Sequence, residues 1–263
     1  MDRRAFVHSL GTAAVLSAFP STGPWTQNSN GTPAGKIMAI AAHPGDGLFT
    51  MGAALAQQIE SGGAGILLSL SLGEKGAPKN IPVPQYGQMQ RAATEKATRL
   101  LGADASFLEY PDAEIPFNEE SSLRVCDIIR EQKPDIVVTH WSGSWHKDHQ
   151  NCHLIVRDAI FYAGLQTLQR RLPEHVVSKV FYADNWEDAT NFVPDTFLNI
   201  EAVYEKWMQA CDFYPMWRGQ TGFFRYNDYY SSLSVMRGCL AGCRYAVALM
   251  SDPAQRTERR RSL

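Results

Sequence analysis

The chain has 263 residues, of which 44% are hydrophobic and 20% are charged, and its formal net charge at pH 7 is −2. This size and composition suit one large globular domain with a full hydrophobic core. The nearly neutral charge gives no support for nucleic acid or an anionic membrane as a partner, and no apolar run approaches the roughly 20 residues that span a bilayer.

The first residues are expected to lie outside the fold. Arg3 and Arg4 precede a short, mildly apolar stretch at residues 12–19, and this order resembles a twin-arginine export signal. A linker rich in Gly, Pro, Ser and Asn follows. The alternative is a basic terminus with chance arginines. We expect a periplasmic or secreted protein. Its signal and linker would occupy residues 1–35, one folded catalytic domain residues 36–251, and a basic tail residues 252–263.

From Lys36 onward, short apolar runs alternate with helical patterns. The alternation predicts an α/β three-layer sandwich whose central sheet is mainly parallel and whose crossovers are right-handed. Strands are predicted at residues 36–42, 65–72, 106–109, 135–140 and 179–183, and helices at 48–60, 86–101, 119–132 and about 148–165. The last third is less regular. An edge strand is predicted at residues 197–200, helices at 201–211 and 231–250, and an aromatic loop at 217–227.

Ligands of such sheets bind at the carboxyl ends of the strands, so the site is expected in the loops after residues 42, 72, 109 and 140. His43 and Asp46 follow the first predicted strand, and His149 lies near the first turn of the helix after the fourth. Since the ends of parallel strands can be neighbours, these three side chains are predicted to share one site. Two histidine nitrogens and one carboxylate, with a fourth position open, are typical ligands of catalytic zinc, although other metals accept the same set.

Other interpretations of the histidines stay open. Four of the seven lie in HWSGSWHKDHQNCH, residues 140–153. A second ligand set would use His149 with His153, four residues apart on one helical face, and the third interpretation is that no metal binds. His140 ends a strand, where a hydrogen bond to the backbone is its ordinary role. Cys152 and His153 are more often packing residues in such a helix.

Two motifs resemble those of a known family. AHPGD at residues 42–46 and HKDH at 146–149 are similar to the AHPDD and HPDH or HxDH motifs of the LmbE-like / PIG-L deacetylases. Further fragments resemble the family's segments in the same order, at Leu72–Gly76, Arg91 with Glu95, Tyr110–Asp112, Arg237–Gly238 and Tyr245–Ala246. The resemblance therefore extends over most of the chain, and its last two fragments are expected in a closing helix.

The resemblance implies a Rossmann-like fold that binds one Zn²⁺ through His43, Asp46 and His149. It also implies the activity of the family, which removes the acetyl group from N-acetylated sugars. The expected partner is therefore a small carbohydrate substrate.

The resemblance further implies roles for residues around the metal. His146 would be the acid and oxyanion partner, and Asp148 would orient a histidine of the motif. Arg91 and Asp112 would contact the sugar. From the residues alone, Arg91 with Glu95 is equally an ordinary ion pair of a helix surface, and Asp112 is equally a turn residue.

Gly45 departs from the family pattern, which has an aspartate there as the general base. Bound zinc lowers the pKa of water to about 7 without help, whereas a positioned base adds roughly 10²–10⁴-fold. We therefore expect altered or reduced activity rather than none. Glu74, in the loop after the second strand, and His146 are the candidates to replace the base, and Glu74 is also a candidate substrate contact.

The predicted function is a zinc-dependent amidohydrolase that removes an acyl group from an N-acylated amino sugar or glycoside. One alternative is a non-catalytic zinc- or carbohydrate-binding protein that lacks the base. Another is a metal-assisted lyase that cleaves glycosides, in which free space beside Gly45 admits a bulkier substrate. The aromatic segment Trp217–Phe224 either lines a sugar site or belongs to the core or to the interface of a homo-oligomer.

Overall fold

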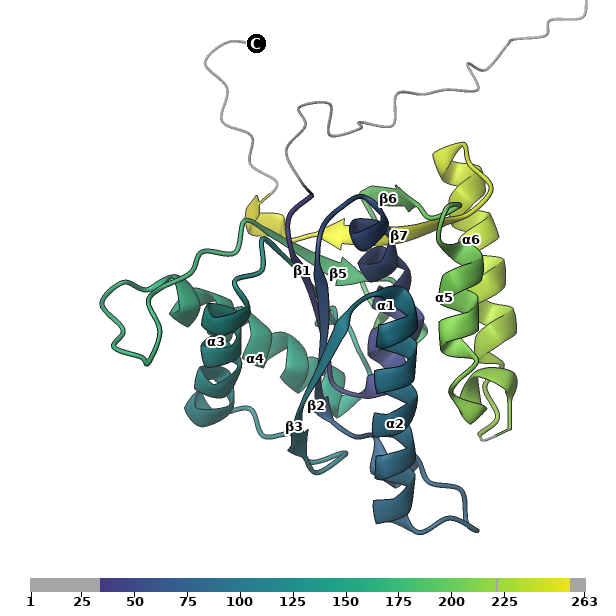
Figure 1. Ribbon diagram of the computed structural model, residues 1–263, viewed down its shortest axis with the longest axis horizontal. Coiled ribbons are helices and arrows are strands. Elements are labelled where there is room, and N and C mark those ends of the chain that lie inside the picture. The colour runs from purple at the N-terminus through teal and green to yellow at the C-terminus, as the bar shows by residue number, and fades with distance from the viewer. Residues whose placement is uncertain (1–33, 221, 256–263) are drawn as a thin grey trace, which may run out of the picture.

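The computed structural model describes residues 34–220 and 222–255. Its centre is a seven-stranded sheet with the order β3-β2-β1-β4-β5-β7-β6 (Figure 1). The first five strands in this order run parallel, and β7 pairs antiparallel with both β5 and β6. The strands are β1 Ile37–Ala41, β2 Gly65–Ser71, β3 Asp104–Tyr110, β4 Ile136–Thr139, β5 Lys179–Ala183, β6 Thr196–Asn199 and β7 Ala246–Ser251.

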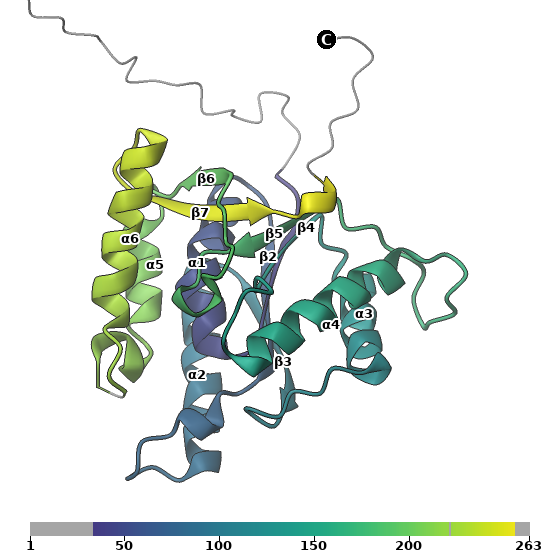
Figure 2. The same ribbon diagram turned by 180° about the vertical axis from the view of Figure 1, so that it is seen from behind.

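Helices cover both faces of this sheet. The helices are α1 Pro44–Glu60, α2 Val83–Leu101, α3 Glu119–Gln132, α4 Lys147–Gly164, α5 Tyr204–Cys211 and α6 Tyr226–Ala241. Figures 1 and 2 show α3 and α4 on one face and the other four helices on the opposite face. The predicted α/β sandwich with a mainly parallel sheet is thereby confirmed. Among the described residues, no helix is both long and apolar enough to cross a membrane.

Most of the predicted export signal, and most of the basic tail, lie outside the described residues. The export signal and the domain limits therefore stay predictions.

The N-terminus of α1 differs from its prediction in a way that shapes the site. The helix begins at Pro44, four residues before the predicted start, with His43 as an extended N-cap. Proline suits the first helical position because its missing N–H would have no partner there. Gly45 and Asp46 therefore lie in the first helical turn and not in a loop, and the Asp46 carboxylate is favoured by the positive end of the helix dipole.

The predicted helix at residues 231–250 is confirmed as far as Ala241 and is wrong beyond it. Helix α6 ends at Ala241, and Gly242 takes a left-handed conformation with φ 73° that terminates it. The following apolar run forms β7, which lies between β5 and β6. A short apolar run buried in a sheet has no periodicity that separates it from a buried helix. Ala246 consequently begins a strand, directly after Tyr245, and neither residue lies in a closing helix.

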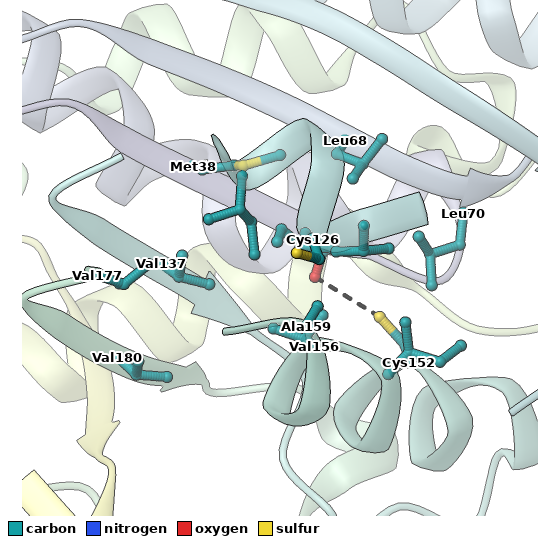
Figure 3. Packing of buried hydrophobic residues seen from close by; sticks show 14 of the residues in the cluster. Met38, Leu68, Leu70, Cys126, Val137, Cys152, Val156, Ala159, Val177 and Val180 are labelled. Carbon is teal, nitrogen blue, oxygen red and sulfur yellow. Dashed lines mark hydrogen bonds between the residues drawn. The ribbon is translucent and has the colours of Figure 1, made fainter. Parts of the chain in front are cut away.

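The packing of α3 and α4 against the sheet fixes where the site can form. Met38, Leu68, Val137 and Val180 of the sheet pack in one buried cluster with helical side chains, among them Cys126 and Val156 (Figure 3). Cys152 of α4 is fully buried, and its Sγ lies 3.8 Å from the carbonyl oxygen of Ile40 in β1. This contact holds the N-terminal turns of α4 beside the end of β1.

Candidate functional site

The three predicted metal ligands meet at the carboxyl ends of β1 and β4, which are adjacent parallel strands. His43 Nδ1 lies 2.9 Å from Oδ2 of Asp46, one helical turn further on. His149, in the first turn of α4, places Nε2 3.2 Å from the same carboxylate oxygen. The ligand atoms of the three residues lie within 4.8 Å of one another. The structure therefore brings together the set that the sequence predicted.

A second carboxylate lies behind each histidine of this set. Oδ1 of Asp112 lies 3.0 Å from Nε2 of His43, and Oδ1 of Asp188 lies 2.8 Å from Nδ1 of His149. Each ring thus turns one nitrogen toward Asp46 and the other toward an outer carboxylate. Such outer carboxylates fix the orientation of metal-binding histidines and increase their basicity.

The electrostatics of this cluster favour positive charge at its centre. Burial alone would lower the pKa of His149, but Asp46 and Asp188 raise it to about 9. Burial alone would raise the pKa of Asp46, but the charges and hydrogen bonds of His149 and His43 lower it well below its usual value. The same arrangement of carboxylates would favour a bound cation.

A buried carboxylate supports the fit to a metal ion. Asp148 is fully buried, and neither of its oxygens accepts a hydrogen bond from the described residues. Its nearest charged partner is Nε2 of His43, at 3.5 Å. A carboxylate in this position is costly unless a cation or a donor compensates it. Imidazole and carboxylate groups are also the donors that zinc and its neighbours in the first transition row accept.

His140 and His153 have other roles in the structure. His140 accepts a hydrogen bond at Nε2 from the backbone N–H of Ala42, at 3.1 Å, and its Nδ1 lies 2.8 Å from Asp188. The expected backbone hydrogen bond of His140 is therefore present. His153 Nδ1 lies 3.1 Å from the carbonyl oxygen of His140, and His153 belongs to no candidate ion group in the described part of the chain. The second predicted ligand set, His149 with His153, is not assembled.

His146 is the N-cap of α4 and lies against the metal ligands. Its ring stacks on His149 with 4.6 Å between centroids, and its Nδ1 accepts a hydrogen bond from the backbone N–H of Asp148 at 3.2 Å. Burial and the charges of His149 and His43 lower its pKa to about 4. The ring is therefore neutral at pH 7, and because Nδ1 is an acceptor, the proton is on Nε2.

Two of the predicted substrate contacts hold the site together from the loops after β2 and β3. Asp112 Oδ2 accepts a hydrogen bond from the backbone N–H of Lys75 at 2.9 Å, while its Oδ1 faces His43. Glu74 Oε1 in turn accepts from the backbone N–H of Asp112 at 2.8 Å. Both oxygens of Asp112 thus have protein partners. These contacts orient His43 through Asp112.

Arg91 faces β3 in this structure. It forms an ion pair with Glu109, and its guanidinium lies 4.3 Å from the centre of the Phe107 ring. The ordinary interpretation, an ion pair with Glu95, is not what the structure shows. A contact between Arg91 and a sugar stays a prediction.

The loop after β5 contributes site residues that the sequence interpretation missed. Besides Asp188, it places Oε2 of Glu187 3.6 Å from Nε2 of His149. Burial and the negative charge of Asp46 raise the pKa of Glu187 to about 7. Asn185 Nδ2 lies 3.4 Å from Oδ1 of Asp46. The sequence does contain a pattern that indicates these residues. The acidic pair Glu187 and Asp188 follows the predicted strand 179–183, whose carboxyl end belongs to the same sheet edge.

The space beside Gly45 is filled. A Cβ at this position would lie 3.3 Å from the Phe49 ring and 3.5 Å from Sδ of Met216. Gly45 is helical and is absent from the residues with positive φ in the described chain, so its backbone does not require glycine. The prediction of free space for a bulkier substrate is therefore wrong, because the Phe49 ring and the Met216 thioether occupy this space.

Fold and site together define an α/β protein with a candidate metal centre at the carboxyl edge of β1 and β4. Residues 38–160 match the PIG-L family, described as GlcNAc-PI de-N-acetylase. The resemblance to the LmbE-like / PIG-L family that the motifs predict is confirmed by this match.

Known relatives cover most of the chain. It is 25% identical over 228 residues to 4-oxalmesaconate hydratase of Pseudomonas putida, covering 82% of this chain and 84% of that protein. It is 23% identical over 231 residues to diacetylchitobiose deacetylase of Thermococcus kodakarensis, covering 83% of each. The crystal structure of GalB, the 4-carboxy-2-hydroxymuconate hydratase of Pseudomonas putida, matches with a TM-score of 0.77 and 22% identity over 85% of this chain and 98% of that chain. Similarity alone therefore does not choose between deacetylation and hydration.

Proposed function

We propose that this protein is a metal-dependent hydrolase that removes an acyl group, such as acetyl, from an N-acylated amino sugar. The observation that carries the proposal is the cluster of His43, Asp46 and His149 with a carboxylate behind each histidine. A relative named as a deacetylase of diacetylchitobiose supports this choice of substrate class.

The three ligands would hold one divalent ion, for which Zn²⁺ is our first candidate. When bound, such an ion polarises a carbonyl group and acidifies water. The partial exposure of His43 and Asp46, 13% and 15% of their side chains, leaves the cluster open to a substrate on one side. His149 is fully buried behind them and anchors the cluster to α4.

His146 would stabilise the transition state. Attack of water on the acyl carbon creates negative charge on the carbonyl oxygen, and a preorganised donor aimed at this charge accelerates the step. The protonated Nε2 of His146 is such a donor. Because Nδ1 is held by the backbone N–H of Asp148, the ring keeps this orientation throughout the reaction.

Glu187 would take over the role of the general base, because Gly45 stands where the family has the aspartate that serves as that base. Of the two substitutes predicted from the sequence, Glu74 is bound to the backbone of Asp112, and His146 is protonated at the nitrogen that would have to accept a proton. Glu187 has a partly exposed carboxylate next to His149. In this scheme Glu187 accepts a proton as the water oxygen bonds to the acyl carbon. It returns the proton to the amine as the C–N bond breaks, giving a carboxylic acid and a free amino sugar.

The charge of the site disfavours the hydratase reaction. Five carboxylates gather around the centre, and they outnumber the two positive charges of one divalent ion: Asp46, Asp112, Asp148, Glu187 and Asp188. Of three neighbouring cations, Lys75 pairs with Glu114 and Arg91 with Glu109, whereas Lys147 donates a hydrogen bond to the carbonyl oxygen of Ala113. The related structure is named for 4-carboxy-2-hydroxymuconate, whose carboxylates would add negative charge to a site that stays negative even with a divalent ion bound. A neutral N-acyl sugar avoids this repulsion.

A substrate panel tests the proposal. Purified protein with added Zn²⁺ would be given N,N'-diacetylchitobiose, cellobiose and 4-carboxy-2-hydroxymuconate. We expect acetate release from the first and no reaction with the other two. Cleavage of cellobiose would indicate the glycoside lyase, and consumption of the carboxylated acid would indicate a hydratase. The absence of any turnover, with binding retained, would indicate a non-catalytic binding protein.

A further inference from the structure

An aromatic surface borders the candidate site from three segments of the chain. Trp145, in the loop between β4 and α4, lies with its ring centroid 5.7 Å from His146 and 5.9 Å from Trp186. Trp186, in the loop after β5, stacks on Phe224 with 4.2 Å between centroids and an angle of 12° between the rings. We name Trp145, Trp186 and Phe224 the aromatic wall.

The wall is joined to the proposed catalytic groups through the chain itself. Trp145 directly precedes His146, and Trp186 directly precedes Glu187. The two tryptophans therefore lie on the same short segments that carry the donor and the carboxylate. A ring bound against Trp145 would lie next to these groups.

Trp145 is exposed to an unusual degree for its type. It is 66% accessible, whereas Trp207 and Trp217 are buried in the core. Tryptophan is highly buried on average, and exposed aromatic side chains that form one contiguous patch beside a polar cluster are typical of a binding surface. Phe161, at the far end of α4, is similarly exposed at 63% but follows the proposed donor by 15 residues, about four helical turns.

The position of Trp186 explains why Trp145 can present its ring. Trp186 meets Trp145 edge-on and stacks on Phe224, and Phe224 also packs against Tyr226 and Tyr229 of α6. Trp145, the most exposed ring of the wall, therefore rests on aromatic side chains that support it from behind. Trp217, which the sequence interpretation placed with Phe224 as a stacking candidate, is instead fully buried.

We propose that the aromatic wall is a binding subsite for a sugar ring of the substrate, which stacks its C–H face on the indole of Trp145. This inference rests on the proposed function for the substrate class. The face of an indole is electron-rich, and the C–H groups on one side of a pyranose carry partial positive charge, so the two surfaces attract each other while burying apolar area. A carboxylated planar ligand fits less well, because the five nearby carboxylates exceed the charge of one divalent ion and leave the site negative.

The test is binding of N,N'-diacetylchitobiose to chelator-treated protein, in which turnover is blocked, measured by isothermal titration calorimetry. Trp145→Ala is compared with Trp145→Phe, which retains a stacking surface, and with Phe161→Ala, which removes an equally exposed aromatic ring elsewhere. Both positions are at the surface, and thermal unfolding of each of the three variants would verify the fold. We expect the Kd to rise about tenfold in Trp145→Ala, less than threefold in Trp145→Phe and not at all in Phe161→Ala.

Equal Kd values for Trp145→Ala and Phe161→Ala would overturn the inference, and so would absence of binding to the unmodified chain. Acetate release by the zinc-loaded protein is measured separately. Binding that depends on Trp145 without acetate release would refute the proposed reaction and leave the sugar subsite standing. Acetate release with unchanged binding in Trp145→Ala would refute the subsite and leave the reaction standing.

Discussion

Oδ1 of Asp188 lies 2.8 Å from Nδ1 of His149, and both side chains are fully buried. The other ring nitrogen of His149 faces Asp46, so this contact decides which nitrogen is presented to an ion. Oδ2 of Asp188 lies 2.8 Å from His140, which also accepts a hydrogen bond from the backbone at the end of β1. One carboxylate from the loop after β5 thus orders the ends of three neighbouring strands.

Asp188→Asn is predicted to weaken Zn²⁺ binding about 10–100-fold, because the amide no longer supplies the negative charge behind His149. Competition with a chromogenic chelator measures the affinity. Asp158→Asn, which changes a half-buried carboxylate of α4 that pairs with Arg157, is the control and should leave the affinity unchanged. Equal affinities in the two variants would show that Asp188 has no influence on the ion.

Glu187→Gln is predicted to lower kcat for acetate release roughly 10²–10⁴-fold, the usual contribution of a positioned base. Metal content, measured by mass spectrometry, should stay the same because Glu187 is not in the predicted ligand set. Glu114→Gln, in an exposed pair with Lys75, is the matched control and should keep full activity. Loss of the metal in Glu187→Gln would instead make Glu187 a ligand.

His146→Ala is predicted to lower kcat roughly 10²–10³-fold through loss of the donor to the carbonyl oxygen. His146→Gln, whose amide can donate a hydrogen bond, should recover part of this loss. Rate measurements at saturating substrate separate this effect from binding. If the alanine and glutamine variants are equally slow, the donor role of Nε2 is wrong.

Gly45→Asp is predicted to destabilise the protein by about 1–3 kcal/mol, because the Phe49 ring, 3.3 Å from the added Cβ, must shift to admit the side chain. Chemical denaturation measures this change. Combined with Glu187→Gln, the same substitution should restore part of the acetate release, since it returns a carboxylate to the position that the family uses. No recovery in the double variant would mean that the site no longer accommodates a base at this position.

Sequence patterns predicted those parts of the site that follow predicted strands directly. His43 and Asp46 after β1 and His149 after β4 could be placed together because adjacent parallel strands end at one edge. Asp188 and Glu187 follow the same rule after β5, but two acidic residues in a loop resemble an ordinary solvated turn until the neighbouring strands are known. Their importance depends on long-range contacts with His140 and His149.

The two largest errors in the fold have local causes. Pro44 at the first position of α1 looks like a break in the sequence, although it is compatible with a helix start. In the last third, Gly242 divides a run that has no clear periodicity, and only pairing with β5 and β6 makes residues 246–251 a strand. The contents of the space beside Gly45 could not be predicted at all, since Met216 reaches it from a distant segment.

The most direct test of a metal-dependent hydrolase is the zinc content and acetate release of three proteins: the unmodified chain, His149→Ala and His153→Ala. We predict about one zinc per chain and acetate release from N,N'-diacetylchitobiose for the unmodified chain and His153→Ala, and the loss of both in His149→Ala. Acetate release that persists in His149→Ala without bound metal would contradict the proposed mechanism. Zinc retained by His149→Ala but lost from His153→Ala would contradict the proposed ligand set.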